Sequence, residues 1–327
     1  MANIIQYYFF IFFVSAGLAA IFLVFAKKIS KKYGLHDNPH NDSLKRHKEP
    51  ISFLGGAGIL AAFCLSLGII WLLGRLGEFN FEGEKIAALF IAGIISWFYG
   101  FWDDTLWQDR IKINQSAKIF LQVPIMLAMS FIFYTAGIKY QIFNSSLPGI
   151  FTMAFLFLFI SNAVNLQDGL DGLASGVILI TMIGFSVYFA ILGHVFLFLV
   201  SAAVAGAIDS FLVFNWSPAS IFLGNNGSYF LGFLAAFMAI MASSPSRFFY
   251  SLSPLFLLGA PILNVVYVFS KRLANGRSPF SADRGHIHDD LFKLTKSVPK
   301  SAILIFIIQF FCSALGLFFL IAFKNFL

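Results

Sequence analysis

Long apolar runs recur along this chain and constrain its fold more than any other feature. Ten of them approach or exceed the roughly 20 residues that a helix needs to cross a bilayer, at about 4–26, 51–74, 84–101, 117–135, 149–164, 172–192, 194–214, 227–242, 250–269 and 302–323. Hydrophobic residues make up 59% of the 327 residues and charged residues 11%, whereas soluble domains carry roughly a quarter charged residues. The sequence therefore predicts an all-α polytopic membrane protein with about ten transmembrane helices in a single domain, residues 1–327.

The distribution of basic residues predicts how these helices are oriented. Of the 22 Lys and Arg residues, 17 fall in alternate loops on one side, all of them in 27–50, 102–118 and 270–301. Because cytoplasmic loops are enriched in Lys and Arg, we expect five loops in the cytoplasm and both termini outside. The net charge of +7 then reflects membrane orientation, so the lipid bilayer is the expected partner and nucleic acid is not.

Acidic residues and histidines gather in the same loops, which orientation alone does not explain. Eleven of the 15 acidic residues and five of the six histidines lie there. This concentration predicts an active site that is built from cytoplasmic loops and handles a charged, water-soluble molecule. Cys64 and Cys312 both lie inside apolar runs and are interpreted as buried hydrophobic residues rather than as a disulfide.

Two acidic segments carry the strongest chemical signal. Asp103 and Asp104 follow the third apolar run, and adjacent carboxylates at a membrane surface need a cation or proton between them. Asn165, Asp168 and Asp171 recur every third residue, which on a helical turn would place their oxygens along one face, as Mg²⁺ prefers. For Asp103 and Asp104 the alternative is a solvated loop in which nearby cations neutralise the two carboxylates. This alternative is weaker for the segment with Asp168 and Asp171, because that segment contains no Lys or Arg.

Three further polar segments belong to the same predicted face. Asn215 and Asn225 belong to one polar segment, 215–228, whose Gly-Asn-Asn-Gly-Ser run, which contains Asn225, is also typical of a turn and helix cap. Arg284, His286 and His288 lie in a basic loop before the last apolar run; they suit phosphate contacts better than a zinc site, although an ordinary cytoplasmic loop is the alternative. Lys45 precedes the second run, where contact with anionic lipid head groups is equally consistent.

Taken together and in this order, these segments resemble the polyprenyl-phosphate N-acetylhexosamine-1-phosphate transferase superfamily. The likeness covers nearly the whole chain, and its most specific part is the Asn-x-x-Asp-Gly-x-Asp-Gly-Leu-Ala pattern that begins at Asn165. The ending Ser-Pro-Phe-x-x-Asp-Arg-x-His-x-His is similar to the branch that uses simple UDP-N-acetylhexosamines. The resemblance implies polyprenyl phosphate as a substrate and a location in a bacterial inner membrane, with the active site facing the cytoplasm, and it leaves open whether this protein is a homodimer.

The resemblance implies a role for each matching residue. Carried over, the catalytic residues are Asp103, Asp104, Asp168 and Asp171. Asn165 and Asn225 stand at positions associated with Mg²⁺, for which Mn²⁺ is an alternative ion. The residues implied in substrate binding are Lys45, Lys118, Asn215, Arg284, His286 and His288. The family usually has Asp at position 225 and His at position 289, where this chain has Asn225 and Asp289.

The implied reaction transfers a sugar 1-phosphate from a UDP-sugar to polyprenyl phosphate and releases UMP, as a first membrane step of cell-envelope polysaccharide or glycan synthesis. Two alternatives remain at this point. One is a secondary transporter of an anionic metabolite, although transporter sites usually lie near the midplane between repeated halves and no repeat is visible. The other is a degenerate member that binds the donor without turnover, which the residues at positions 225 and 289 motivate.

Overall fold

The computed structural model describes residues 2–39, 49–79, 81–107, 113, 115–140, 146–243, 248–278 and 285–324. Its elements are helices, apart from one pair of two-residue strands. In chain order they are α1 Ala2–Tyr33, β1 His36–Asp37, β2 Ile51–Ser52, α2 Gly55–Arg75, α3 Gly83–Trp102, the π-helical turn η2 Asp103–Trp107, α4 Gln115–Thr135, α5 Ser146–Asn165, α6 Leu173–Leu192, α7 Val195–Asn215, α8 Gly224–Ala242, α9 Phe248–Leu257, α10 Gly259–Ala274, α11 Ile287–Thr295 and α12 Val298–Lys324.

Most of the predicted spans are confirmed as single helices. Within the described residues, nine helices are long and apolar enough to cross a membrane, and they match nine of the ten predicted runs. The protein is thus an all-α, multi-pass membrane protein. The β1–β2 pair, in which His36 lies opposite Ser52, was not predicted, because two residues are too few to give a sequence pattern.

The remaining run, 250–269, does not form one continuous helix. It is divided at Leu258 into α9 and α10, and a side chain from α12 replaces the lost helical hydrogen bonds. Gln309 accepts a hydrogen bond from the Ala260 amide at 2.9 Å and donates one to the Leu257 carbonyl at 2.7 Å. Because unpaired backbone groups are costly at membrane depth, this one glutamine makes the break tolerable.

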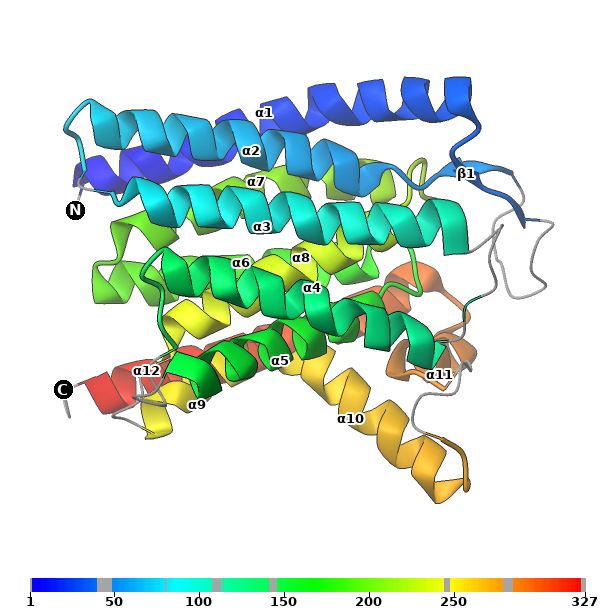
Figure 1. The fold of residues 1–327 in the computed structure, drawn as a ribbon. Helices are drawn as coiled ribbons and strands as arrows, with labels where there is room; N and C mark the ends of the chain where they lie inside the picture. Colours follow the sequence, from blue (N-terminus) through cyan, green and yellow to red (C-terminus); the bar gives the residue numbers. More distant parts are fainter. Residues whose placement is uncertain are drawn as a thin grey trace.

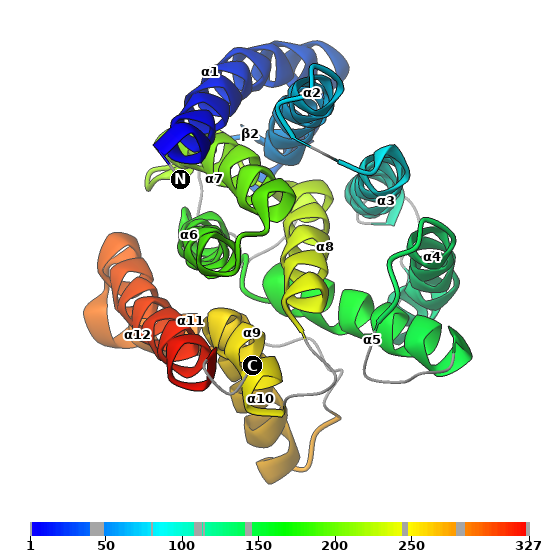
Figure 2. The same ribbon diagram turned by 90° about the vertical axis from the view of Figure 1, so that its left-hand side faces the viewer.

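Helix α8 forms the centre of the bundle. Buried residues make up 89% of its span, against 28% for α1 and for α12, and in the end-on view it lies between α3, α5 and α7 (Figure 2). Small residues allow this packing: a Cβ on Gly232 of α8 would lie 2.5 Å from the Ser161 Cα of α5. Close approach through small residues is the usual means of helix packing in membranes.

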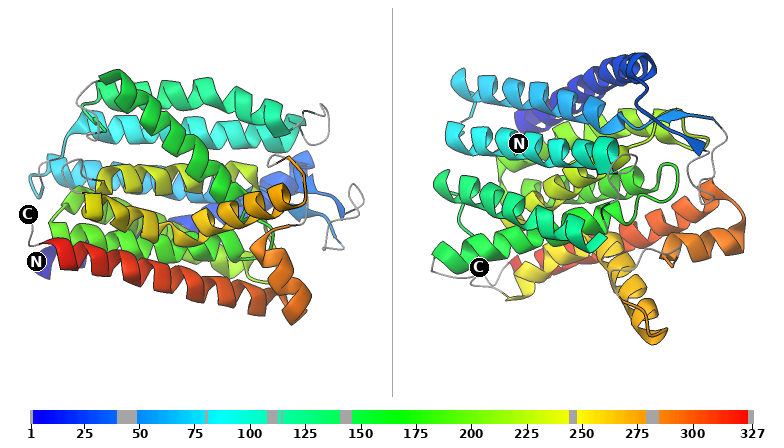
Figure 3. Two further views of the ribbon diagram at one scale, coloured as in Figure 1. Left: turned by 90° about the horizontal axis from the view of Figure 1, so that it is seen from below. Right: turned by 45° about the vertical axis from the view of Figure 1, so that its right-hand side comes forward.

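The two ends of the bundle differ in character. The start of α1 and the end of α12 lie at one end, and β1, η2 and α11 lie at the other (Figure 1). Helix α10 runs away from the remaining helices towards the second end (Figure 3). The predicted site segments therefore meet at the end of the bundle that is opposite the termini, which we call the loop end.

Candidate active site

The two adjacent aspartates lie where α3 turns into η2. Asp103 and Asp104 are only 2% and 6% exposed, so they are not part of a solvated loop. Helix α3 ends at Trp102, and the π-helical turn begins with the two carboxylates. Such π-helical turns often mark functional sites. Here the turn brings both side chains into contact with α8, and Asp103 also contacts Lys118 of α4.

The N-terminus of α8 holds the Asp104 carboxylate. The backbone amides of Asn225 and Asn226 each donate to it at 3.0 Å, and the Asn226 side chain adds a third hydrogen bond at 2.7 Å. A helix N-terminus favours negative charge in this way. The approach requires glycine at position 100, because a Cβ there would lie 2.3 Å from the Asn225 carbonyl oxygen.

The Asp103 carboxylate is held by one cation and one amide. Lys118 of α4 donates from Nζ to Oδ1, and Asn225 donates from Nδ2 to Oδ2 at 3.1 Å. The Lys118 side chain is 14% exposed, so this is a largely buried ion pair. The structure therefore brings the predicted phosphate-binding Lys118 and the predicted catalytic Asp103 into direct contact.

The two asparagines that were predicted for the metal contact each other. Asn165, the last residue of α5, donates from Nδ2 to Asn225 Oδ1 at 2.7 Å and to Ser228 Oγ at 2.9 Å. Asn225 is therefore the link between Asp103 and Asn165. The Gly-Asn-Asn-Gly-Ser run does begin a helix, as the helix-cap alternative predicted, and that helix end also carries the polar contacts of the site.

Asp168 faces this cluster from the loop between α5 and α6. Within the described residues its carboxylate makes no hydrogen bond. Burial, together with the negative charges of Asp104 and Asp171, raises the pKa of Asp168 to about 7 from an ordinary value of 3.8. Asp104 and Asp171 therefore each repel an ionised Asp168, and a bound cation next to Asp168 would offset this repulsion.

The loop that contains Asp168 and Asp171 is not helical, unlike the helical turn that the three-residue spacing suggested. Helix α5 ends at Asn165 and α6 begins at Leu173, so the side chains of Asn165, Asp168 and Asp171 do not share one helical face.

Hydrogen bonds hold this loop in place. Asp171 accepts a hydrogen bond from the Ala219 amide at 3.1 Å. Asn215 accepts from the Gly172 amide at 3.0 Å and donates to the Ile221 carbonyl at 2.9 Å; these bonds tie the loop to the end of α7.

The two histidines stack where α11 begins. The rings of His286 and His288 are nearly parallel, with centroids 5.1 Å apart, and both side chains are buried. His288 lies against the acidic loop, because a Cβ on Gly169 would be 2.1 Å from its Nε2. Asp289 Oδ2 lies 3.8 Å from the same nitrogen. The other two basic residues that were predicted here, Lys45 and Arg284, lie outside the described residues.

Asn264 connects the histidines to the acidic loop, a role that the sequence did not reveal. It lies on α10, 3.3 Å from His286 Nδ1, and it donates to the Leu166 carbonyl at 3.4 Å. Its Oδ1 accepts from the Ile287 amide at 3.3 Å. Asn264 could have been noticed in the sequence as a polar residue inside an apolar run, but such a residue is equally often explained by a hydrogen bond between two membrane helices.

The comparisons with known proteins agree with these motifs. Residues 86–243 match glycosyl transferase family 4. The chain is 29% identical over 315 residues to a probable undecaprenyl-phosphate N-acetylglucosaminyl 1-phosphate transferase of Bacillus subtilis, covering 92% of this chain and 82% of that protein. These matches support the resemblance of the chain to the polyprenyl-phosphate N-acetylhexosamine-1-phosphate transferase family.

Two further relatives of this transferase family have related names. An undecaprenyl-phosphate alpha-N-acetylglucosaminyl 1-phosphate transferase of Escherichia coli K12 is 28% identical, covering 82% of this chain and 72% of that protein. A decaprenyl-phosphate N-acetylglucosaminephosphotransferase of Mycobacterium tuberculosis is also 28% identical, covering 80% of this chain and 70% of that protein. All three relatives are transferases by name, so the transporter alternative is not favoured.

The oxygen atoms of the transferase site suit Mg²⁺ better than a transition metal. In the described part of the chain, no three His, Cys, Asp or Glu side chains form a ready-made metal site. Mg²⁺ does not need such a cage, because it usually takes one or two carboxylates, water and substrate phosphates. Asp168 fits this requirement, because the carboxylates of Asp104 and Asp171 lie near it and no described residue donates a hydrogen bond to it.

Proposed function

We propose that this protein transfers an N-acetylhexosamine 1-phosphate from a UDP-sugar to polyprenyl phosphate and releases UMP. The observation that carries the proposal is the convergence of Asp103, Asp104 and Asp168 with Lys118 and Asn225 at one end of a membrane bundle. An acceptor lipid in the bilayer and a soluble donor can both reach such a position. The names of the relatives support a polyprenyl phosphate acceptor and an N-acetylglucosamine 1-phosphate group.

The transfer requires two anions to meet, so charge neutralisation and positioning should contribute most to the rate. An oxygen of the lipid phosphate attacks the donor phosphorus that carries the sugar and forms a new P–O bond. The bond from that phosphorus to the bridging oxygen breaks, and UMP leaves with the electron pair. Any proton still present on the acceptor phosphate passes to Asp103.

The remaining residues of the chain bind and orient the two substrates. We assign Lys118 to the acceptor phosphate, next to Asp103, and the stacked His286 and His288 to the donor diphosphate. By the resemblance, Lys45 and Arg284 would add cations to the same phosphates. Asp104 would stay fixed by the α8 N-terminus, because its two oxygens already accept three hydrogen bonds.

We propose Mg²⁺ as the cofactor, held by Asp168 with Asp171 and the oxygens of Asn165 and Asn225 nearby. When bound, it would offset the charge of the donor diphosphate and of the departing UMP phosphate. The site would face the cytoplasm of a bacterial inner membrane, where nucleotide-sugars are available, and the product would enter synthesis of a cell-envelope polysaccharide. The excess of Lys and Arg in the loops at this end supports that orientation.

Identification of the released nucleotide tests the proposal. Membranes that contain the protein are incubated with polyprenyl phosphate, Mg²⁺ and a panel of UDP-sugars, and membranes with the Asp103→Asn variant are the control. We expect UMP from at least one UDP-N-acetylhexosamine. Release of UDP alone would place the protein in another transferase class, and donor binding without turnover would support the degenerate alternative.

A further inference from the structure

Helix α10 begins at the break that divides it from α9, and this break lies directly against α12. Pro261 has no amide proton, so it cannot donate the helical hydrogen bond to the Leu257 carbonyl. A Cβ on Gly259 would lie only 2.4 Å from the Cβ of Cys312 in α12. The angle between α9 and α10 is therefore set where both helices meet α12.

One side chain of α12 binds both sides of the break. Gln309 is fully buried; its Oε1 accepts from the Ala260 amide at 2.9 Å, and its Nε2 donates to the Leu257 carbonyl at 2.7 Å. Its Nε2 also donates to Ser313 Oγ at 2.9 Å, which orients the amide group. Because Gln309 bonds to the last residue of α9 and to the second residue of α10, it fixes the angle between these helices.

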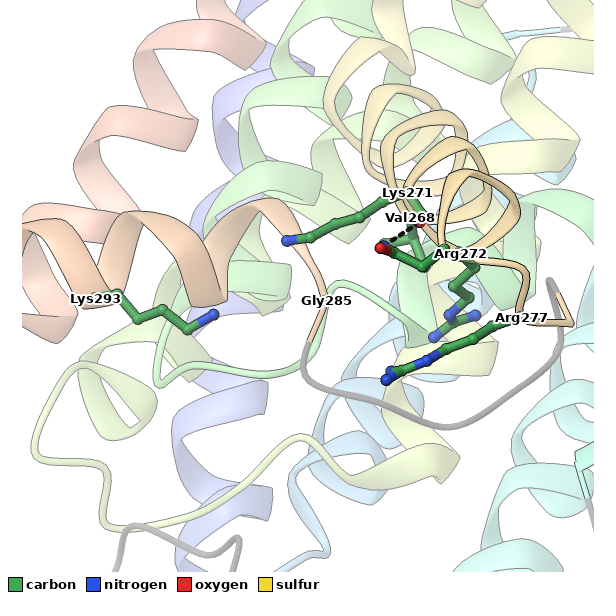
Figure 4. Close-up of a pocket in the computed structure, with 7 residues that line it drawn as sticks. Val268, Lys271, Arg272, Arg277, Gly285 and Lys293 are labelled. Carbon is green, nitrogen blue, oxygen red and sulfur yellow. Dashed lines mark hydrogen bonds between the residues drawn. The ribbon is translucent and has the colours of Figure 1, made fainter.

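The direction of α10 decides where α11 lies. Asn264, Tyr267 and Lys271 follow one another at spacings of three and four residues, so they share one face of α10. Asn264 lies 3.3 Å from His286 Nδ1. The Asp290 carboxylate accepts from Tyr267 at 2.7 Å and from Lys271 at 2.5 Å, and Lys271 extends from α10 towards α11 (Figure 4). All three contacts join α10 to the start of α11.

A small change of angle at the break becomes a larger displacement at Asn264. Asn264 lies six residues beyond Leu258, which is about 9 Å along a helix. A rotation of about 10° at the break would therefore move Asn264 by about 1.5 Å. A misplacement of about 1 Å is enough to impair a catalytic site.

We propose that Gln309 is a positioning residue for the donor site. By fixing α10 at the break, it fixes Asn264 and, through Asn264, the stacked His286 and His288. This role rests on the proposed function, which assigns the two histidines to the donor diphosphate. The hydrogen bonds of Gln309 lie at the break and within α12, so Gln309 acts on the donor through α10.

The test measures how fast His286 reacts in the full-length protein without any donor. Diethyl pyrocarbonate acylates accessible imidazole nitrogens, and peptide mass spectrometry follows each histidine separately. Gln309→Met keeps the length of the side chain but removes the amide donor and acceptor. Ser253→Ala is the matched control, because Ser253 is also fully buried and its hydrogen bond to the Gly316 carbonyl, at 2.7 Å, joins α9 rather than α10 to α12. The exposed His194, between α6 and α7, is an internal reference.

Buried groups react through local opening of the structure, and loss of a buried hydrogen bond shifts such an equilibrium by about two- to tenfold. We therefore expect His286 to react about tenfold faster in Gln309→Met than in the parent. Ser313→Ala, which removes only the bond that orients the Gln309 amide, should give an increase of about threefold. Ser253→Ala should stay within about twofold of the parent, and His194 should react equally in all variants.

Activity measurements follow the same path to the donor. The KM for the UDP-sugar should rise about tenfold in Gln309→Met and in Asn264→Ala, and the double variant should resemble Asn264→Ala alone, because both changes act on one contact. The effects of Ser253→Ala and Asn264→Ala should instead multiply, as expected of independent sites.

Three results would overturn the proposal. The first is parent-like His286 reactivity in Gln309→Met or, where that variant does not fold, in Ser313→Ala. The second is an equal increase in Ser253→Ala, and the third is a multiplied rise of KM in the double variant with Asn264→Ala. Absence of UMP release by the parent would overturn the proposed function instead, and the reactivity of His286 would still decide whether Gln309 positions the histidines.

Discussion

The side-chain amide of Asn225 donates a hydrogen bond to the Asp103 carboxylate over 3.1 Å. The same amide accepts a hydrogen bond from Asn165, so one neutral side chain connects two parts of the site. The family usually has Asp at this position, and a carboxylate there would face Asp103 with like charge. The asparagine allows the carboxylate cluster to pack without a cation between these two residues.

Asp103 has a structural role as well as the proposed catalytic one. Asp103→Asn should reduce UMP release by at least about a hundredfold, because a preorganised charge contributes on this scale. It should also lower the melting temperature, since loss of one partner from a buried ion pair costs roughly 3–5 kcal/mol. Both effects are measured on purified protein.

A second substitution separates these two roles. In Asp103→Asn/Lys118→Met the buried ammonium is absent as well, so most of the lost stability should return while activity stays low. Parent-like turnover in either variant would contradict the assignment of Asp103 to the reaction.

Asn226 positions Asp104 and was not singled out from the sequence. Its side chain donates to Asp104 at 2.7 Å and to the Phe53 carbonyl at 2.8 Å, and it accepts from Trp97 at 3.2 Å. Asn226→Ala should lower kcat about tenfold with little change in KM, because Asp104 would lose one of its three donors.

The matched control for this position is Asn162→Ala. Asn162 also makes two side-chain hydrogen bonds, to Gln122 and to the Leu158 carbonyl, but it does not touch the carboxylates. Asn162→Ala should lower the melting temperature without the fall in kcat that is expected for Asn226→Ala. Equal losses of kcat in both variants would show that Asn226 acts only through general packing.

Asp168 should make the metal-free protein sensitive to pH. Its folded-state pKa of about 7 lies above the ordinary 3.8, so the folded state binds the proton more tightly than the unfolded state. This contribution is present below about pH 3.8 and is lost as pH rises to about 7. In EDTA, the melting temperature should therefore fall between pH 5 and 7.5, and it should fall less in Asp168→Asn.

The same ionisation should help metal binding. Because the ionised carboxylate is the better Mg²⁺ ligand, the Mg²⁺ concentration that gives half-maximal stabilisation should decrease as pH rises from 6 to 8. An identical pH response in the parent and Asp168→Asn would remove Asp168 from the metal site.

The sequence predicted the spans well because each needs only a long apolar run. It also predicted that the site residues come together, and those that the structure describes do lie at one end of the bundle, because loops at one end must lie near one another. It could not show that 250–269 is broken, because the compensating partner, Gln309, lies 49 residues from Ala260. Residue spacing likewise suggested a helical turn at Asp168, whereas that segment is a loop whose end is held by a hydrogen bond from the Gly172 amide to Asn215.

The individual contacts in the site could not be predicted from the sequence either, because the partners lie far apart along the chain. Asp103 contacts Lys118 and Asn225, which come from two other helices. Such partners are set by how helices pack, and the glycines that permit the packing, Gly100 among them, are not distinguishable in the sequence from other glycines in apolar runs.

Gly169 tests the contact between the acidic loop and the histidines. In Gly169→Ala the new Cβ would lie 2.1 Å from His288 Nε2, so the imidazole must move away from the loop. We expect the KM for the UDP-sugar to rise about tenfold, with a smaller change in melting temperature. Gly17→Ala is the control, because nothing lies within 4 Å of a Cβ at that position. A parent-like KM would place His288 outside the donor site.

The last prediction concerns Asn225→Asp, which restores the residue that the family usually has. Without Mg²⁺, the new carboxylate would repel Asp103 at the position of the present hydrogen bond, so the melting temperature in EDTA should fall below that of the parent. With Mg²⁺, the added charge should strengthen binding: an ion pair near 4 Å is worth roughly 4 kcal/mol at an effective dielectric of about 20, and desolvation offsets much of it.

A surviving gain of about 1–2 kcal/mol corresponds to roughly 5–30-fold tighter Mg²⁺ binding. Asn225→Asp should therefore lower the Mg²⁺ concentration for half-maximal activity and show a larger Mg²⁺-dependent rise in melting temperature than the parent. Asn225→Ala, which lacks both the charge and the amide oxygen, should need more Mg²⁺ than the parent. If both variants follow the parent's Mg²⁺ titration curve, position 225 does not contact the metal and serves only to link Asp103 to Asn165.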